Sequence, residues 1–452
     1  MKVVGLITEY NPFHNGHKYH IEEARRITGA DYVIAVMSGN FVQRGTPAVI
    51  DKYSRTEMAL KNGVDLVLEL PVCYATGSAE YFAHGAVALL DKLGIVDTLC
   101  FGSEAGEIGL LCEASNLLLQ APDSFEVQLQ ARLKEGLTYP AARVKAVEHT
   151  LKMNGALNAA ILTDILAEPN NILGIEYIKA IKHLSSSIEP ITIRRISAHY
   201  HDSDLSSNTL QSSSPIQACE IKTSRPAIEQ KDLELCNPII SSATALRSAI
   251  YSTGGDPQEA LRAASESVPA DVAEYLIHNY HKTYPITEED FAAMIKYKLL
   301  QEEHSSLAEY QDLSADLAKR LKNFPNYHGS LSSLTQEIKT KNITLTRVNR
   351  ALIHLLLNIK TEDLRLYQNH GYISYARVLG IRKESSRLLK QIEKSGRIPV
   401  ITKVSKAEEQ LDECGMRLLS TDIFASHLYN QAVYDKYRTS IPNEYQHGIC
   451  IL

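Results

Sequence analysis

Short apolar runs alternate with helical stretches through the first hundred residues, and this alternation constrains the fold more than any other feature. Four runs rich in Val, Ile and Leu predict strands; they are Val3–Thr8, Tyr32–Met37, Val64–Leu70 and Val96–Phe101. The stretches between them predict helices over Lys18–Arg26, Lys52–Asn62 and Ala79–Lys92. Strands separated by helices of this length form βαβ units with right-handed crossovers. The sequence therefore predicts an α/β fold built on a Rossmann-like parallel sheet.

The chain has 452 residues, which is too long for one ordinary domain, and its pattern changes after the first hundred residues. Residues 105–185 have a mainly helical pattern, and Ile191–Ser197 predicts another strand. Ser, Thr, Asn, Gln and Pro are concentrated over residues 203–229, which we expect to form a mobile loop. We predict a first domain over residues 1–255 and a mainly helical C-terminal domain over residues 256–452.

The composition argues against several classes of protein. A hydrophobic content of 44% and a charged content of 22% are typical of a soluble globular protein, and no apolar run is long enough to span a bilayer. The amino-terminal residues have the pattern of a strand rather than of a signal peptide. The seven cysteines include no Cys-x-x-Cys pair, which argues against a disulfide framework or a zinc ribbon. We expect a cytoplasmic protein with no membrane partner and no metal site built from protein ligands alone.

The loop after the first predicted strand carries the strongest chemical signal. It reads Asn11-Pro12-Phe13-His14-Asn15-Gly16-His17, and a helix begins close to His17. Backbone N–H groups and the positive end of the helix dipole attract phosphate at such a point. Gly16 lets a phosphate approach the backbone, and His14 and His17 can donate hydrogen bonds to charge that develops at an α-phosphate. The alternatives are a chance pair of histidines on a surface loop, or two metal ligands.

A second segment has the same character. The run Ser241-Ser242-Ala243-Thr244-Ala245-Leu246-Arg247 places hydroxyl groups at a predicted helix start and an arginine one turn later. Ser242, Thr244 and Arg247 are suited to clamp a triphosphate. The alternative is an ordinary N-cap, Ser241 or Ser242, on a surface helix.

These segments and several others carry a family resemblance. The first loop resembles the His-x-Gly-His motif of nucleotidylyltransferases and class I aminoacyl-tRNA synthetases, and the second resembles their Ile-Ser-Ser-Thr-x-x-Arg motif, from which Ser241 and Ala243 depart. Further matching segments are Gly5–Tyr10 before the first loop, Met37–Gly45, Asp51-Lys52 with Arg55, Glu69-Leu70-Pro71, Phe101-Gly102-Ser103-Glu104 and Pro169-Asn170-Asn171-Ile172-Leu173-Gly174. Together they resemble the bacterial tRNA(Met) cytidine acetate ligases over most of the chain.

The resemblance implies an enzyme that forms acetyl-adenylate and pyrophosphate from ATP and acetate, and then acetylates the N4 amine of the wobble cytidine of elongator tRNA(Met). It implies catalytic roles for His14, His17 and Arg247, and Mg²⁺ that accompanies ATP on phosphate and water ligands. The ATP contacts that it implies are Ile7, Thr8, Glu9, Tyr10, Asn11, Pro12, Phe13, His14, Asn15, Gly16, His17, Lys18, Tyr19, His20, Gly102, Asn171, Arg194, Arg195, Ser242 and Thr244.

Some assignments stay open at this point. Gly102 can also be a turn glycine and Asn171 an N-cap. The sequence does not decide between Asn170 and Asn171, or between Arg194 and Arg195. A further group can contact pyrophosphate, acetate or RNA, or can form a solvated loop and helix face; it comprises Gln43, Arg44, Lys52 and Arg55.

The C-terminal half supplies separate evidence for an RNA partner. Residues 336–406 hold fifteen Lys and Arg against five Asp and Glu, in a chain whose net charge is −6. Tyrosines lie among these basic residues, a combination that suits RNA phosphates and unstacked bases. We predict tRNA contacts from Arg377, Arg382, Lys383, Arg387 and Lys390, on a helix-and-turn substructure over residues 372–403. The alternative is a salt-bridged helix face.

Two other functions compete with the acetate ligase. A small-molecule adenylyltransferase that makes a dinucleotide-type cofactor would share the first loop, but would leave the basic C-terminal half without a role. A nucleotide-regulated RNA-binding protein without turnover would share both halves. Pyrophosphate release with and without acetate separates the three.

Overall fold

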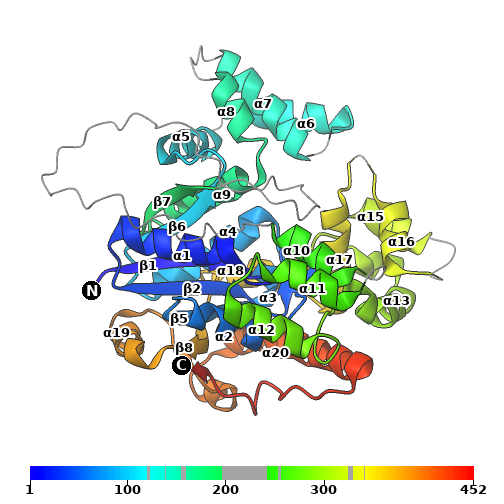
Figure 1. Ribbon diagram of the computed structural model, residues 1–452. Helices are drawn as coiled ribbons and strands as arrows, with labels where there is room; N and C mark the ends of the chain where they lie inside the picture. Colours follow the sequence, from blue (N-terminus) through cyan, green and yellow to red (C-terminus); the bar gives the residue numbers. More distant parts are fainter. Residues whose placement is uncertain are drawn as a thin grey trace, which may run out of the picture.

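A computed structural model describes residues 1–119, 123–137, 139–153, 159–195, 242–252, 256–323, 329–340 and 342–452. At its centre is an eight-stranded sheet with the strand order β10-β8-β5-β2-β1-β6-β7, in which β9 also pairs with β8 (Figure 1). Five strands are mutually parallel: β1 (Val3–Thr8), β2 (Tyr32–Ser38), β5 (Leu66–Leu70), β6 (Thr98–Ser103) and β7 (Glu189–Arg194). The predicted α/β fold on a Rossmann-like parallel sheet is confirmed.

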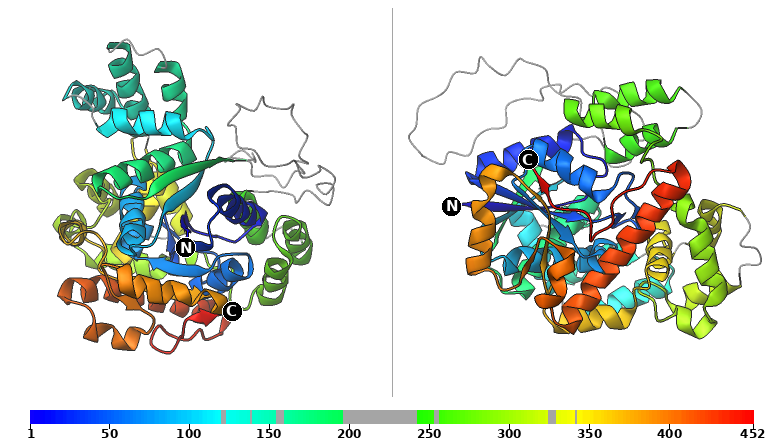
Figure 2. Two further views of the ribbon diagram at one scale, coloured as in Figure 1. Left: turned by 90° about the vertical axis from the view of Figure 1, so that its left-hand side faces the viewer. Right: turned by 90° about the horizontal axis from the view of Figure 1, so that it is seen from below.

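Helices cover both faces of this sheet (Figure 2). Those before residue 190 are α1 (Asn15–Thr28), α2 (Lys52–Lys61), α3 (Val72–Ala75), α4 (Ala79–Lys92), α5 (Ile108–Leu119), α6 (Asp123–Lys134), α7 (Tyr139–Met153), α8 (Ala159–Ile165) and α9 (Pro169–His183). A short antiparallel hairpin joins β3 (Phe41–Val42) to β4 (Thr46–Pro47). The later helices are α10 (Ala243–Tyr251), α11 (Pro257–Ser265), α12 (Ala270–Asn279), α13 (Ala292–Gln301), α14 (His304–Leu307), α15 (Ala315–Lys322), α16 (Leu331–Ile338), α17 (Leu345–Leu356), α18 (Thr361–Asn369), α19 (Arg387–Ser395) and α20 (Glu413–Tyr437), with 3₁₀ turns at Glu288–Phe291, Lys383–Ser385 and Val404–Glu409.

Alternate residues of the central strands enter two separate hydrophobic cores. Val3 and Ile34 point to the face covered by α4 and α9, and Val4 and Val33 point to the face covered by α1, α2 and α10 to α12. Because side chains alternate across a strand, a strand buried on both faces needs apolar residues in succession. This requirement explains why the strands were detectable as unbroken apolar runs.

The C-terminal half takes part in the sheet, contrary to the expectation of a mainly helical domain that follows it. β8 (Ala376–Ile381) pairs antiparallel with β5, while β9 (Val400–Ile401) and β10 (Cys450–Ile451) pair parallel with β8. The helix-and-turn substructure expected over residues 372–403 is therefore a β-α-β unit, β8-α19-β9. The boundary proposed at residue 255 does not separate the sheet from the second half of the chain, since β8 buries both of its faces within it. The loop proposed over residues 203–229 lies outside the described residues.

The two ends of the parallel strands face different surroundings. In Figure 1 their amino ends lie on the left, beside α19 and both chain termini, and their carboxyl ends lie toward α10 and α17. Within the described residues, no helix combines the length and the apolar character needed to cross a lipid bilayer.

Candidate functional site

A cavity of 290 Å³ opens at the carboxyl ends of β1, β6 and β7. Ligands of open α/β sheets bind at this edge, because the loops that follow the strands converge there. The lining residues are Ile7, Thr8, Glu9, His14, Gly16, His17, Tyr19, His20, Gln43, Arg44, Phe82, Phe101, Gly102, Asn170, Leu173, Tyr177, Ile193, Arg194, Arg195, Ser242, Ala243, Thr244 and Arg247. The structure thus brings both predicted phosphate segments to one cavity, although they are more than two hundred residues apart in sequence.

The first helix begins with a capping box made by two histidines. Nδ1 of His14, the N-cap residue, accepts the Gly16 N–H at 3.0 Å, and Nδ1 of His17 accepts the His14 N–H at 3.3 Å. The two imidazole rings stack with their centroids 3.7 Å apart. Since two of the helix's unpaired N–H groups are satisfied in this way, the ring positions are set by the helix terminus itself.

These contacts decide where the imidazole protons are. Burial lowers the pKa of His14 to about 3, with help from the charges of Arg195 and Arg247. Burial, together with His14, His20 and Arg195, lowers the pKa of His17 well below its usual value. Both rings are therefore neutral at pH 7. A neutral ring whose Nδ1 accepts a hydrogen bond carries its proton on Nε2, so each ring has an Nε2–H donor to offer.

The second predicted segment is connected directly to the first loop. Ser242 is the N-cap of α10 and accepts the Ala245 N–H at 3.0 Å. Arg247, one turn into α10, donates to the carbonyl of Asn11 at 2.8 Å and to the hydroxyl of Thr244 at 3.1 Å. The guanidinium thus reaches the cavity wall while it holds the loop that precedes α1. Ser242, Thr244 and Arg247 all line the cavity, as the motif predicts.

The ends of β6 and β7 bring two arginines to the same cavity. Arg194 and Arg195 both line it, and the charge of Arg195 lowers the pKa values of His14, His17 and His20. A Cβ atom added at Gly102 would lie 3.2 Å from Cγ of Arg195. Glycine at this strand end therefore leaves room for the arginine side chain to cross β6.

Asn170 and Asn171 have different surroundings. Asn171 is 2% exposed, and its side-chain oxygen accepts the Ala105 N–H at 3.0 Å, which holds the loop after β6 against α9. Asn170 lines the cavity and donates to Glu104 at 2.5 Å. Of the two asparagines, Asn170 is the one exposed to a ligand in the cavity, and Asn171 is placed to support it.

Several residues of the predicted ATP list do not line the cavity; they are Tyr10, Asn11, Pro12, Phe13, Asn15, Lys18 and Asn171. Tyr10 and Phe13 are buried, and their ring centroids lie 4.9 and 5.5 Å from that of His17. The side chain of Asn11 accepts the Val49 N–H at 2.8 Å, and Lys18 is exposed on α1. These residues shape the loop around the two histidines instead of forming its ligand surface.

Sequence reasoning missed the apolar part of the wall. Phe82, Phe101, Leu173, Tyr177 and Ile193 form it, with Phe101 and Tyr177 packed at a centroid separation of 5.5 Å. Leu173 and Tyr177 lie one turn apart on α9, so their common helix face was readable. Nothing in the sequence indicated that this face would meet the end of β6.

Lys52 and Arg55 are fully buried, so neither the ligand contact nor the solvated helix face proposed for them is correct. Arg55 donates to the carbonyls of Glu9 at 2.6 Å, Ser38 at 3.0 Å and Ile50 at 2.9 Å, and also to the carbonyl of Gly39. It therefore ties together the carboxyl ends of β1 and β2.

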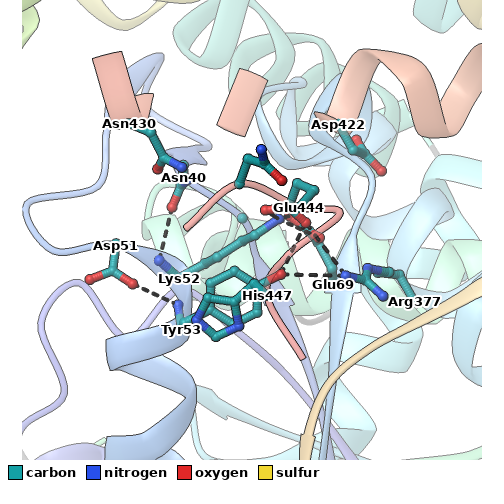
Figure 3. Close-up of polar contacts among 12 residues, drawn as sticks. Asn40, Asp51, Lys52, Tyr53, Glu69, Arg377, Asp422, Asn430, Glu444 and His447 are labelled. Carbon is teal, nitrogen blue, oxygen red and sulfur yellow. Dashed lines mark hydrogen bonds and ion pairs between the residues drawn. The ribbon is translucent and has the colours of Figure 1, made fainter. Parts of the chain in front are cut away.

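Lys52 belongs to a buried charge cluster with Glu69, Arg377 and Glu444 (Figure 3). Its Nζ lies 2.7 Å from Glu69 and 3.1 Å from Glu444, and Arg377 lies 3.5 Å from Glu444. Arg377 is 1% exposed, so the expectation that it contacts tRNA phosphates on the surface is not met. The cluster stands beside the cavity and connects the C-terminal segment to the sheet.

The other predicted tRNA residues are accessible. Lys383, Arg387 and Lys390 are exposed on one face at the start of α19, and Arg382 is partly buried against Glu384 at 2.6 Å. The Arg382 N–H donates to the carbonyl of Asp65, immediately before β5. This basic stripe therefore lies at the amino ends of the parallel strands, on the opposite edge of the sheet from the cavity.

No group of three or more His, Cys, Asp or Glu side chains in the described part of the chain is arranged to hold a metal ion. Glu9 is the one carboxylate among the described residues that line the cavity. The lining is otherwise rich in imidazole and guanidinium donors, which suits a polyanionic ligand.

Comparisons with known proteins agree with this geometry. Residues 1–227 and 211–444 match the family described as HIGH Nucleotidyl Transferase. The chain is 37% identical over 450 residues to the tRNA(Met) cytidine acetate ligase of Halothermothrix orenii, covering 95% of this chain and 94% of that protein. It is 36% identical over 430 residues to the enzyme of the same name from Acetivibrio thermocellus, with the same coverage of both proteins.

Two solved structures are similar over the full length of the chain. The crystal structure of Thermotoga maritima TmcAL bound with alpha-thio ATP has a TM-score of 0.83, and the apo structure of that protein has a TM-score of 0.85. Each is 29% identical in sequence, with 100% of both chains covered.

Proposed function

This chain belongs to the tRNA(Met) cytidine acetate ligase family, and from that premise we propose that it activates acetate with ATP and acetylates the N4 amine of the wobble cytidine of elongator tRNA(Met). The observation that carries the proposal is the pair of neutral imidazoles, His14 and His17, fixed at a helix N-terminus in the cavity. Neutral Nε2–H donors at this point suit charge that develops on a phosphate during reaction.

In the first half-reaction the carboxylate of acetate attacks the α-phosphorus of ATP. The bond from the α-phosphorus to the bridging oxygen breaks, and pyrophosphate leaves with the electron pair. His14, His17 and Arg247 donate to oxygens whose negative charge grows in the transition state. Mg²⁺ enters with ATP as part of the substrate, held by phosphate oxygens and water.

In the second half-reaction the cytidine amine attacks the acetyl carbonyl of acetyl-adenylate, and AMP leaves. The apolar wall of Phe101, Leu173 and Tyr177 gives the cavity a surface for an adenine ring and for the acetyl methyl group. This wall also excludes water, which protects a mixed anhydride from hydrolysis.

The basic stripe of Lys383, Arg387 and Lys390 has a part in this proposal that its position restricts. A strand of six residues is roughly 20 Å long, so the stripe lies about that far from the cavity and cannot hold the reacting base. Its residues follow one another at intervals of four and three, and they therefore present one row of charges to an RNA backbone. We assign it to phosphates of the tRNA body, away from the wobble position.

Pyrophosphate release from ATP, measured with and without acetate, tests the function. The ligase releases pyrophosphate only when acetate is present, and transfers the acetyl group only when tRNA is added. Release that is independent of acetate and needs a small nucleotide acceptor would indicate a cofactor adenylyltransferase. Nucleotide binding with no release would indicate a regulated RNA-binding protein.

A further inference from the structure

Glu9 is held in a fixed position at the cavity. It follows β1 directly, and its carbonyl accepts a hydrogen bond from the buried Arg55 at 2.6 Å. Its side-chain Oε1 accepts the Gln43 N–H at 2.8 Å. Within the described residues its second oxygen, Oε2, makes no hydrogen bond. A carboxylate anchored at its backbone and at one oxygen, with the other oxygen open to the cavity, is arranged to act on a ligand.

The charge of Glu9 is unusual in its surroundings. The other ionisable groups that line the described part of the cavity are the imidazoles of His14, His17 and His20, the hydroxyls of Tyr19 and Tyr177, and the guanidinium groups of Arg44, Arg194, Arg195 and Arg247. A carboxylate repels both a triphosphate and acetate, so it does not improve the binding of either anion. It can, however, accept a hydrogen bond or a proton from a neutral donor, and the exocyclic amine of cytidine is such a donor.

The second half-reaction needs a proton acceptor. When the amine attacks the acetyl carbonyl, the new C–N bond leaves a surplus proton on nitrogen. Neither His14 nor His17 can take it, because Nδ1 of each ring already accepts a backbone N–H and Nε2 of each ring carries a proton. Among the groups fixed at the cavity wall, the open oxygen of Glu9 is free to do so.

We propose that Glu9 is the general base that accepts the N4 proton of the target cytidine, an inference that rests on the proposed function. As the C–N bond forms, the proton passes from N4 to Oε2 of Glu9. The bond from the acetyl carbon to the phosphate oxygen of acetyl-adenylate then breaks, and AMP leaves with the electron pair. Glu9 afterwards releases the proton to solvent, so the residue is regenerated in each turnover.

The Glu9→Gln variant tests this assignment, because it keeps the shape of the side chain and can accept the Gln43 N–H, but cannot take a proton. Two reactions of the same acetyl-adenylate are compared at saturating ATP and acetate. One is transfer to saturating tRNA, and the other is trapping by hydroxylamine, a strong nucleophile that needs no base from the protein. We expect cytidine acetylation to fall about 10²- to 10⁴-fold further than hydroxamate formation.

Thr8→Val is the matched control, since Thr8 also lines the cavity and valine has nearly the same shape. It should change both reactions by one common factor. If Glu9→Gln lowers both reactions equally, or if added Mg²⁺ restores it, Glu9 serves adenylate formation and the inference is wrong. Equal cytidine acetylation by the wild type and Glu9→Gln would also overturn it. A wild-type protein that forms no acetate-dependent hydroxamate would instead refute the proposed function itself.

Discussion

Replacing Glu444 by glutamine should destabilise the protein more than any surface substitution, although Glu444 lies only nine residues from the C-terminus. The carboxylate is 3% exposed and belongs to the buried charge cluster (Figure 3). It lies 3.1 Å from Nζ of Lys52 and 3.5 Å from the guanidinium of Arg377, and it accepts the Tyr53 hydroxyl at 3.0 Å. Its removal leaves two buried cations facing the single carboxylate of Glu69.

The size of the effect follows from this imbalance. Breaking a buried ion pair by removing one partner typically costs about 3–5 kcal/mol, because the remaining charge stays desolvated. A natural protein has a total stability of about 5–15 kcal/mol, so the loss is a large fraction of the whole. Glutamine keeps the volume of the side chain, and the change therefore reports the charge and not a cavity.

Urea unfolding monitored by far-UV circular dichroism measures this cost. Intrinsic tyrosine fluorescence gives a second signal, since the chain has 23 tyrosines and no tryptophan. Glu408→Gln is the control: Glu408 is exposed, and such a change normally stays within about 0.5 kcal/mol. If Glu444→Gln shifts the urea midpoint no further than Glu408→Gln, the cluster does not hold the C-terminal segment as argued.

The pH dependence supplies an independent check. Burial alone would raise the pKa of Glu444, but the charges of Lys52 and Arg377 outweigh it and hold the pKa at about 2. Since the ordinary glutamate pKa is about 4.3, the folded state binds the proton less tightly than the unfolded state. The stabilisation by Glu444 is then complete above about pH 4.3 and is lost as the pH falls toward about 2. The difference between wild type and Glu444→Gln should accordingly narrow below pH 4.

Three further outcomes are expected. His14→Ala or His17→Ala should lower acetate-dependent pyrophosphate release about 100-fold or more without unfolding the protein, and near-normal rates in both variants would remove them from the transition state. Arg247→Ala should weaken ATP handling about 10- to 100-fold while tRNA binding, measured by filter retention, is preserved; loss of RNA binding alone would place α10 in another site. Reversing Lys383 and Lys390 together to glutamate should reduce the salt dependence of tRNA affinity by roughly 0.7–0.9 log units per lost phosphate contact and spare hydroxamate formation, whereas an unchanged salt slope would show that the stripe does not bind RNA.

Much of the catalytic loop could be predicted from the sequence because its geometry is local. A strand that ends at Thr8, a turn, and a helix that begins at Asn15 need only neighbouring residues to form. The roles of His14 and His17 follow from the same short segment, since the helix terminus itself fixes their rings. For the same reason, the unbroken apolar runs were sufficient to predict a sheet that is covered on both faces.

The basic residues could not be sorted in this way, because their burial depends on partners far away in sequence. Lys52 and Arg377 have the same local signature as Lys383 and Lys390, which are exposed. The former pair is buried because Glu69 and Glu444 supply carboxylates from another strand and from the end of the chain. A count of charges within one segment cannot contain this information.

Tertiary structure alone also decided how the two halves of the chain are joined. The pairing of β8 with β5 turns a segment that lies more than three hundred residues away into part of the first domain's sheet. This antiparallel addition sends α19 and its basic stripe to the amino ends of the parallel strands, while Arg247 crosses 236 residues of sequence to reach Asn11 at the carboxyl ends. The sequence by itself determined the chemistry of each segment, and the pairing of distant strands determined which segments face the same cavity, because that pairing depends on long-range packing.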